Sequence, residues 1–501
     1  MNNHTAPSIR RVLPAGAAGP ARWPLHGAAV SRALEQEAAG ALPLHTLMQR
    51  AGLAVCRLAR AVAPHAGCFH VVAGPGNNGG DGFEAAVWLR RAGHEVHVST
   101  VADLGSLPAD AAASLVRARE AGVPIHPGGL HVPPEPRDLV IDALLGLGVS
   151  RPPEGAIAQA IAAINDSPAL RLAVDLPSGL PSDTGQPASP CCVKAHHTLS
   201  LLSLKPGLFT AQGRDHAGEI WFCDLGLQAP ATGADAWLAG VPDATLPSRR
   251  HAQHKGSFGN VVVIGGAPGM TGAALLAARS ALRRGAGRVF VQLLDATGPA
   301  VDPTAPELMF RREIDWQGSA ADDWTAVCGC GGGEAVRTVL PAVLSRAARL
   351  VLDADALNAV ATDPALQTLL VQRSARQQAT VLTPHPLEAA RLLACRVADV
   401  QADRLAQARK LAGRFGAVVL LKGSGSVIAA PDGQATINPT GNALLATAGT
   451  GDVLAGWIGA LWAQGATAQQ AAIAAAFQHG AAADAWAQPG QGAGPHVAGA
   501  L

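Results

Sequence analysis

The sequence has 501 residues with 38 basic and 37 acidic side chains, and a net charge of +1 offers no field to hold a nucleic-acid backbone or an anionic membrane. Hydrophobic residues make up 49% of the chain and charged residues 15%, which excludes a disordered protein. Because the length exceeds one ordinary core, we expect two globular domains whose partners are small molecules.

Neither the cysteines nor the apolar segments indicate a zinc site or export. The eight cysteines include no CxxC pair, so we expect reduced thiols. Residues 1–22 lack the continuous apolar stretch of a secretory signal. The most hydrophobic region, residues 453–477, is interrupted by Gln464, Gln469 and Gln470, which favours a buried helix pair. We therefore expect a cytoplasmic protein.

Residues 25–226, after an N-terminal extension of residues 1–24, are predicted to form the first domain. Apolar strands alternate there with Ala-rich helical stretches, which implies a parallel sheet covered on both faces. The strands are expected at 68–74, 95–101, 138–144, 171–177 and 219–226, and the helices at 83–91, 109–121 and 154–165. The pattern predicts a three-layer α/β domain.

A linker at residues 227–246 is rich in Pro, Gly and small polar residues, and the second domain is predicted at 247–501. A strand at 260–266 leads into a helix at about 272–284, and further strands are expected at 287–293, 349–355 and 379–385. Two apolar runs flank Pro431-Asp432-Gly433, which predicts a β-hairpin. This half is also expected to be a three-layer α/β domain.

The run GTGD, Gly449 to Asp452, directly precedes a helical pattern. Backbone N–H groups and the positive end of a helix dipole can hold an oxyanion there, as a phosphoryl group in transfer requires. Asp452 can then accept a proton from an attacking substrate hydroxyl. By itself, the run fits an N-capping Asp with glycines in a tight turn better than a catalytic carboxylate.

Three further segments favour the catalytic interpretation. LKGSGS places Lys422 where a strand turns, and LTPHP presents His385 at the carboxyl edge of the sheet, where α/β proteins bind ligands. LDADALN places Asp353 and Asp355 at another strand end. Taken singly, the Lys-Gly turn is common, the histidine is more often structural, and one of the two aspartates can cap a helix.

Taken in order with HKGSFGNVVVIGG and TGNALLATAGTGD, these motifs closely resemble the ADP-dependent NAD(P)H-hydrate dehydratases over residues 247 to about 465. The resemblance implies a ribokinase-like fold and repair of NADH and NADPH that have been hydrated on the nicotinamide ring. ADP, with Mg²⁺, would phosphorylate the new hydroxyl of the S epimer. Elimination of phosphate would then restore the double bond, leaving AMP and phosphate.

The resemblance also implies site residues. ADP would lie against Lys422, Gly423, Ser424, Gly425, Ser426 and Gly451, and the hydrate against Ala273, Gly333, His385 and Asp452. The family usually has GPGLG where residues 329–333 read GCGGG, and TGNPGMATGGTGD where this chain has TGNALLATAGTGD. We expect the missing proline to loosen the loop that carries Gly333.

The N-terminal half carries GPGNNGGDG at residues 74–82, between a predicted strand and a predicted helix. Its glycines allow backbone to approach a phosphate closely, but the run is not GxGxxG. The oxygens of Asn77, Asn78 and Asp81 suit a hard cation or a polar ring substituent.

Asp142 and Asp175 end two predicted parallel strands, with Ser178 shortly after the second. Such strand ends converge on one crevice in a doubly wound sheet. Taken singly, each aspartate is better explained as a cap of the next helix or turn.

With LEQEAA at 34–39 and LMQRAG at 47–52, these motifs resemble the NAD(P)H-hydrate epimerases over about residues 25–225, which implies a Rossmann-like domain that interconverts R and S hydrates. The whole chain thus resembles bifunctional repair enzymes, and we expect a homo-oligomer. The hydrate would contact Asn77, Asn78, Gly79, Gly80, Asp81, Gly146, Leu147, Gly148, Val149, Ser150, Arg151, Pro152 and Asp175, and potassium would bind Asn78, Asp142 and Ser178. Asp175 is our candidate for proton transfer during epimerisation.

Two alternatives stay open at this point. The C-terminal half can be an ordinary ribokinase-like small-molecule kinase, which GTGD does not exclude. The N-terminal half can be a nucleotide-binding module without catalytic activity.

Overall fold

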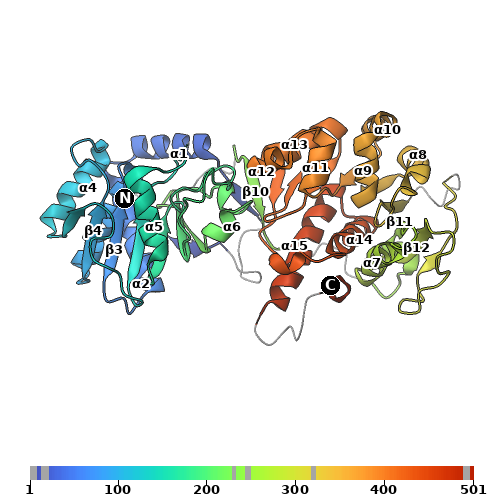
Figure 1. The fold of residues 1–501 in the computed structure, drawn as a ribbon, viewed down its shortest axis with the longest axis horizontal. Helices are drawn as coiled ribbons and strands as arrows, with labels where there is room; N and C mark the ends of the chain where they lie inside the picture. The colour runs from blue at the N-terminus through green and yellow to red at the C-terminus, as the bar shows by residue number, and fades with distance from the viewer. Residues whose placement is uncertain are drawn as a thin grey trace. The chain divides into compact units, whose positions relative to one another are not determined.

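The computed structural model describes residues 8–12, 22–149, 151–227, 233–242, 250–316, 323–488 and 497–501. The chain divides into two compact units, one formed by residues 1–19 and 23–237 and the other by residues 20–22 and 238–501. Each unit is an α/β domain with helices on both faces of its sheet (Figure 1). Within the described part of the chain, no helix is both long enough and apolar enough to cross a membrane.

The N-terminal sheet has the strand order β1-β9-β8-β7-β6-β3-β4-β5, and every neighbouring pair is parallel except β1 with β9. Its strands are β1 (Ile9–Arg11), β3 (Phe69–Ala73), β4 (Val96–Thr100), β5 (Ile125–Pro127), β6 (Leu139–Ala143), β7 (Leu170–Val174), β8 (His197–Leu201) and β9 (Glu219–Cys223). From β3 the chain adds β4 and β5 on one side, and then β6 to β9 on the other side. This change in the order of parallel strands is the Rossmann-like arrangement. Sequence patterns missed β8, because His197, Thr198 and Ser200 interrupt its apolar run.

The helices of this domain are α1 (Ala28–Ala41), α2 (Thr46–Val62), α3 (Asn77–Arg91), α4 (Ala109–Glu120), α5 (Gly155–Asp166) and the short α6 (Gly213–His216), with the 3₁₀ helix η1 (Pro206–Leu208). Helix α3 begins at Asn77 and not near Phe83, so the expected glycine-rich loop is wrong over most of its length. A Cβ on Gly79 would collide with the carbonyl of Gly74, and one on Gly80 would press on the Met48 side chain. Glycine has a low helix propensity, but the tight packing at these positions leaves no room for a larger residue.

In the C-terminal domain the strand order β13-β12-β11-β14-β15-β16-β17 is parallel, and β18 and β19 continue it antiparallel. The strands are β11 (Asn260–Gly265), β12 (Arg288–Leu293), β13 (Met309–Phe310), β14 (Trp324–Cys328), β15 (Arg349–Leu352), β16 (Thr380–Leu382), β17 (Val418–Leu421), β18 (Val427–Ala429) and β19 (Ala435–Ile437). The hairpin predicted around Pro431-Asp432-Gly433 is confirmed. Two more strands, β2 (Arg22–Leu25) and β10 (Ala236–Ala239), lie at the division between the units, and β10 falls inside the predicted linker.

Helices cover both faces of the second sheet (Figure 1). They are α7 (Thr271–Arg283), α8 (Val336–Arg346), α9 (Ala354–Thr362), α10 (Pro364–Ala375), α11 (Pro386–Leu393), α12 (Val397–Ala402), α13 (Arg404–Phe415), α14 (Thr450–Ala463) and α15 (Ala468–Trp486), with 3₁₀ helices η2 (Lys255–Phe258), η4 (Ala443–Leu445) and η5 (Ala498–Ala500). The helix pair predicted within residues 453–477 is confirmed: α14 is almost wholly buried against α7, α15 and the central strands. The start of α14 is thereby fixed at the carboxyl edge of the sheet.

The close packing of α2 on α3 gives a stability prediction. A Cβ on Gly52 would overlap the Cβ of Glu84, whereas one on Gly40 in α1 meets nothing within 4 Å. We expect Gly52→Ala to lower the free energy of unfolding by about 1–3 kcal/mol, because the helices must separate. Its matched control, Gly40→Ala, should raise that free energy by roughly 0.5–1 kcal/mol through the lost entropy of the unfolded chain. Denaturant unfolding of both variants compares them, and equal effects would contradict the packing argument.

Candidate active sites

A cavity of about 630 Å³ opens at the carboxyl ends of β3, β6 and β7, where the N-terminal sheet reverses its strand order. Helices α1 and α2 and the loops after these strands line it. The predicted substrate residues that the lining includes are Asn77, Asn78, Asp81, Gly146, Leu147, Gly148 and Asp175. This is the position that doubly wound folds use for ligands.

Other predicted residues lie elsewhere. Gly79 and Gly80 are buried in helix packing, where they allow the close approach of Gly74 and Met48. Val149, Arg151 and Pro152 follow the lining loop but are not part of the cavity wall, and Ser150 lies outside the described residues.

Asp175 lies just after β7 in the left-handed backbone region, with φ of 66°. Its carboxylate forms an ion pair with the fully buried Lys205 and accepts a hydrogen bond from the Leu201 amide at 3.1 Å. The ammonium of Lys205 also donates to the Leu201 carbonyl at 2.9 Å. Asp175 is therefore held by a buried lysine, and not by the capping bond that the single motif suggested.

A second carboxyl group faces the same cavity. Burial raises the pKa of Glu35 to about 7, and the neighbouring charge of Asp175 adds to the effect. Burial likewise raises the pKa of Asp81 well above its ordinary value. The motif interpretation missed Glu35 and Lys205 as site residues. Lys205 stands in the largely apolar run LLSLKPGLF, but nothing in that run shows that its ammonium will pair with Asp175.

Asp142 and Ser178 meet beneath the cavity loops. The Ser178 amide and hydroxyl donate to the two Asp142 oxygens at 2.8 and 2.6 Å, and the Leu144 amide donates at 3.2 Å. Burial raises the pKa of Asp142, which is fully enclosed, to about 6. The Asn78 side-chain nitrogen is buried without a hydrogen-bond partner in the described structure, and its oxygen faces Gly146. Asp142, Ser178 and Asn78 offer carboxylate, hydroxyl and amide oxygens, and this set of oxygen atoms fits a monovalent cation.

In the C-terminal domain, Asp452 joins Asp353 and Cys330 in a compact cluster. One ligand atom from each of the three lies within 4.8 Å of the others. Asp452 is in the first turn of α14, whose N-cap is Gly449 in the left-handed region, so Asp452 is not the capping residue. Burial raises the pKa of Asp452 to about 7, and the charge of Asp353 raises it further. A carboxyl group whose pKa lies near neutral pH can accept a proton from a substrate.

Lys422 connects the cluster to the KGSGS loop. Its ammonium donates to Asp353 Oδ1 at 2.7 Å and lies 4.0 Å from Glu388 Oε2. A Cβ on Gly451 would come within 3.4 Å of that ammonium. The structure thus brings together the two segments, residues 422–426 and Gly451, that the resemblance assigned to ADP.

The buried Arg404 holds the start of this loop. Its guanidinium donates to the carbonyls of Leu421 and Lys422 at 3.2 and 3.1 Å, and to Gln401 Oε1 at 2.8 Å. Gly423, with φ of 141°, has its Cα against the same guanidinium, which leaves no room for a side chain. The loop backbone is therefore set by an arginine that lies outside the recognised motifs.

His385 has the structural role that we weighed as the alternative, and one face of it also remains open. As the N-cap of α11, its Nδ1 accepts from the Leu387 and Glu388 amides at 3.1 and 3.4 Å. Its side chain is 45% exposed, and Nε2 lies 3.3 Å from Glu388 Oε1. The Lys422 amide donates to the Pro384 carbonyl at 2.9 Å, which joins the TPHP turn to the KGSGS strand.

The GCGGG loop meets the start of α7, where Ala273 lies. A Cβ on Gly331 would come within 2.8 Å of the Ala273 Cβ. The Gly333 amide donates to Asp355 Oδ2 at 2.8 Å, and the Ala267 amide to the Gly331 carbonyl at 2.7 Å. These bonds anchor the loop at its middle and at its C-terminal end, and its expected loosening stays a prediction.

Cys330 and Glu388 were missed as site residues. Burial raises the pKa of Glu388 to about 7, with Lys422 opposing the shift. The signal for Glu388 was present, because it stands three residues after His385 in capping-box spacing, and both capping bonds form. Cys330 carried no such signal. Its contact with Asp452 depends on two chain segments that only folding brings together.

Comparison with known proteins gives two family matches. A model described as NAD(P)H-hydrate dehydratase matches residues 261–495, and one described as YjeF-related protein N-terminus matches residues 44–207. The bifunctional NAD(P)H-hydrate repair enzyme Nnr of Escherichia coli (strain K12) is 39% identical over 468 residues, covering 90% of this chain and 87% of its own. The bifunctional NAD(P)H-hydrate repair enzyme of Leishmania braziliensis is 40% identical over 484 residues, covering 89% and 86%.

Among solved structures, the ADP/ATP-dependent NAD(P)H-hydrate dehydratase from Bacillus subtilis, co-crystallised with ATP and Mg²⁺, is 32% identical. It covers 52% of this chain and 90% of its own, with a TM-score of 0.43.

The raised pKa of Asp452 predicts how stability depends on pH. The folded carboxyl titrates at about 7 and the ordinary one at 3.8, so the folded state binds the proton more tightly. The cost of the buried charge therefore grows as pH rises from about 4 to about 7 and is complete above that. We expect Asp452→Asn to unfold at a higher temperature than the wild type at pH 8. The difference should shrink towards pH 4, and a difference independent of pH would contradict the assignment.

Proposed function

Because the chain belongs to the family of bifunctional NAD(P)H-hydrate repair enzymes, we propose that the N-terminal cavity and the C-terminal carboxylate cluster are its two active sites. The protein is an NAD(P)H-hydrate epimerase, an isomerase, fused to an ADP- or ATP-dependent NAD(P)H-hydrate dehydratase, a lyase. The observation that carries the C-terminal assignment is the position of Asp452. It lies in the first turn of α14, with a pKa of about 7, beside the Lys422–Asp353 pair.

In dehydration, the hydroxyl on the S hydrate attacks the terminal phosphorus of ADP while Asp452 accepts the hydroxyl proton. Backbone amides at the start of α14 and the Lys422 ammonium stabilise the charge on the transferred phosphoryl group, and AMP leaves. The carbon–oxygen bond then breaks and phosphate departs. The neighbouring carbon loses a proton, and the electrons of that carbon–hydrogen bond form the restored double bond. Arg404 serves the phosphoryl transfer by holding the loop at residues 422–426.

Mg²⁺ would enter with the nucleotide. The oxygens of Asp353 and Glu388 suit this hard cation, whereas the Cys330 sulfur does not. When bound, the ion would neutralise phosphate charge.

In epimerisation, the ring hydroxyl must leave one face and return on the other. Glu35, whose pKa of about 7 keeps a large fraction of it protonated at neutral pH, lies on the cavity wall, where it donates a proton to release the hydroxyl as water. Asp175, held by Lys205, takes the proton from the water that returns. Two carboxyl groups with different environments can divide the acid and base roles in this way.

One assay with two variants tests both assignments. Purified protein is mixed with NADPH hydrate, ADP, Mg²⁺ and K⁺, and the return of reduced-nicotinamide absorbance is followed. Loss of the base should make Asp452→Asn slower in dehydration by roughly 10²–10⁴-fold while R and S forms still equilibrate. Asp175→Asn should show the reverse: the S form is repaired at the normal rate, and the R form persists.

Each variant is the matched control for the other, and circular dichroism checks that both fold. If a stable phosphorylated product accumulates and no NADPH returns, the C-terminal site is that of a kinase. Unchanged epimer exchange in Asp175→Asn would remove Asp175 from the mechanism.

We also propose that K⁺ binds Asn78, Asp142 and Ser178, supported by the buried Asp142 carboxylate and the Ser178 hydroxyl against it. K⁺ should raise the unfolding temperature of the wild type and speed epimerisation, because the ion offsets the buried charge. The Asp142→Asn variant should lose both responses. Na⁺ at the same ionic strength is the control, and an equal response to both ions would contradict a specific site.

A further inference from the structure

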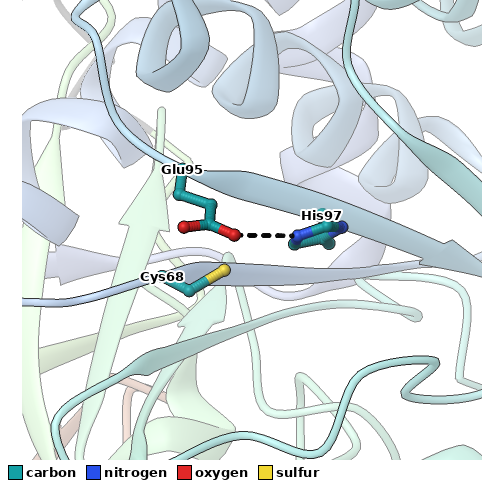
Figure 2. A group of neighbouring side chains, drawn as sticks. All are labelled: Cys68, Glu95 and His97. Atoms are coloured by element: carbon teal, nitrogen blue, oxygen red, sulfur yellow. Dashed lines mark hydrogen bonds and ion pairs between the residues drawn. The ribbon is translucent and has the colours of Figure 1, made fainter.

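Three side chains of metal-binding type meet at the amino-terminal edge of the N-terminal sheet (Figure 2). Cys68 precedes β3 and Glu95 precedes β4, and these strands run parallel with Phe69 opposite Val96. His97 follows Glu95 by two residues and so points to the same face of the sheet. The Cys68 sulfur, a Glu95 oxygen and a His97 ring nitrogen all lie within 4.8 Å of one another.

This cluster is separate from the catalytic cavity. The cavity opens at the carboxyl ends of the strands, and the cluster lies at their amino ends. A five-residue strand such as β3 separates its two ends by roughly 16 Å. No residue of the cluster takes part in either proposed reaction.

The distance between Glu95 and His97 is long for a hydrogen bond but matches the distance between two ligands of one metal ion. Glu95 Oε1 lies 3.4 Å from His97 Nε2, longer than the 2.7–3.2 Å usual for such bonds. Two ligand atoms at about 2.0–2.1 Å from a tetrahedral ion lie roughly 3.3 Å apart. The observed separation is thus the one that an ion between the two atoms would set.

The position of the proton on the His97 ring decides whether the contact with Glu95 needs a cation. Nδ1 is buried and has no hydrogen-bond partner within the described structure. A proton placed on Nδ1 leaves the Nε2 lone pair facing the Glu95 oxygen, and the two then repel unless a cation lies between them. Placed on Nε2, the proton gives only the long contact with Glu95 and leaves the buried Nδ1 lone pair unpaired.

Cys68 supplies the third potential ligand. Its Sγ points towards the other two side chains (Figure 2) and makes only a weak contact, 3.7 Å, with the Phe69 carbonyl. Asp138 accepts a hydrogen bond from the Cys68 amide at 3.0 Å, which fixes the backbone and adds negative charge nearby. Because Sγ lies within 4.8 Å of the other two ligand atoms, closure onto an ion needs the thiol to move by no more than about 1 Å.

We propose that Cys68, Glu95 and His97 bind a divalent ion of the zinc class, with water as the fourth ligand. Sulfur, imidazole and carboxylate together favour zinc over magnesium or calcium, which prefer oxygen. The Glu95 side chain is 67% exposed, so the ion can enter from solvent and keep a water ligand. Because the ligands come from two strands, no spacing in the sequence reveals the set.

The test is a titration of the metal-stripped full chain with Zn²⁺, and with Co²⁺ to detect a thiolate-to-metal absorption band. We expect one equivalent bound at this site and a higher unfolding temperature with zinc. Cys68→Ser, Glu95→Gln and His97→Gln should each weaken binding by at least about tenfold, and Cys68→Ser should abolish the cobalt band.

Matched controls exist in the same domain and in the other. Cys191→Ser removes another half-exposed thiol, and His126→Gln removes the imidazole stacked 5.9 Å from His97. Neither should change affinity, and Cys330→Ser separates binding at the Cys330, Asp353 and Asp452 cluster. Normal unfolding curves without metal show that the ligand variants fold. Wild-type affinity in all three ligand variants, or a cobalt band that only Cys330→Ser removes, would overturn the proposal.

Discussion

The partly buried Lys422 and the buried Asp353 form an ion pair on which the geometry of the C-terminal site depends. Asp353 follows β15, Lys422 follows β17, and the pair lies against the start of α14 at Gly451. Removing Lys422 leaves the buried Asp353 charge unpaired, at a cost of up to roughly 3–5 kcal/mol. The strand ends, the loop at residues 422–426 and the helix that carries Asp452 are therefore held in one arrangement by a single electrostatic requirement.

The N-terminal domain meets the same requirement in its own way. Lys205 pairs with Asp175 below the cavity, and the carboxyl group beside that pair, Glu35, has a pKa of about 7. In the C-terminal domain, Asp452 beside the Lys422–Asp353 pair also has a pKa of about 7. In each site a lysine neutralises one carboxylate, and burial leaves a second able to exchange protons at neutral pH. The proton transfers that we propose for the two reactions thus rely on the same physical arrangement.

Sequence patterns predict the features that depend on local periodicity and miss those that depend on distant partners. The alternation of apolar runs predicted both α/β domains, and GTGD predicted the helix start that presents Asp452. Lys205 was missed, because its burial depends on a carboxylate thirty residues away in sequence. The start of α3 was misplaced because the reason for its glycines is contact with Gly74 and Met48, which propensity does not contain. Close packing between separate segments is the information that one sequence window lacks.

The same electrostatic argument supports the K⁺ proposed at Asp142 and distinguishes this carboxylate from Asp353 and Asp175. Asp353 and Asp175 each have a lysine, and both lysines come from the chain itself. Asp142 is as deeply buried, yet its described hydrogen bonds come from neutral donors, the Ser178 hydroxyl and the Ser178 and Leu144 amides. Neutral donors reduce the cost of burying a carboxylate but do not cancel its charge, so its pKa remains raised, to about 6. A mobile monovalent ion can supply the missing charge without a side chain, and it leaves the cavity above free for substrate.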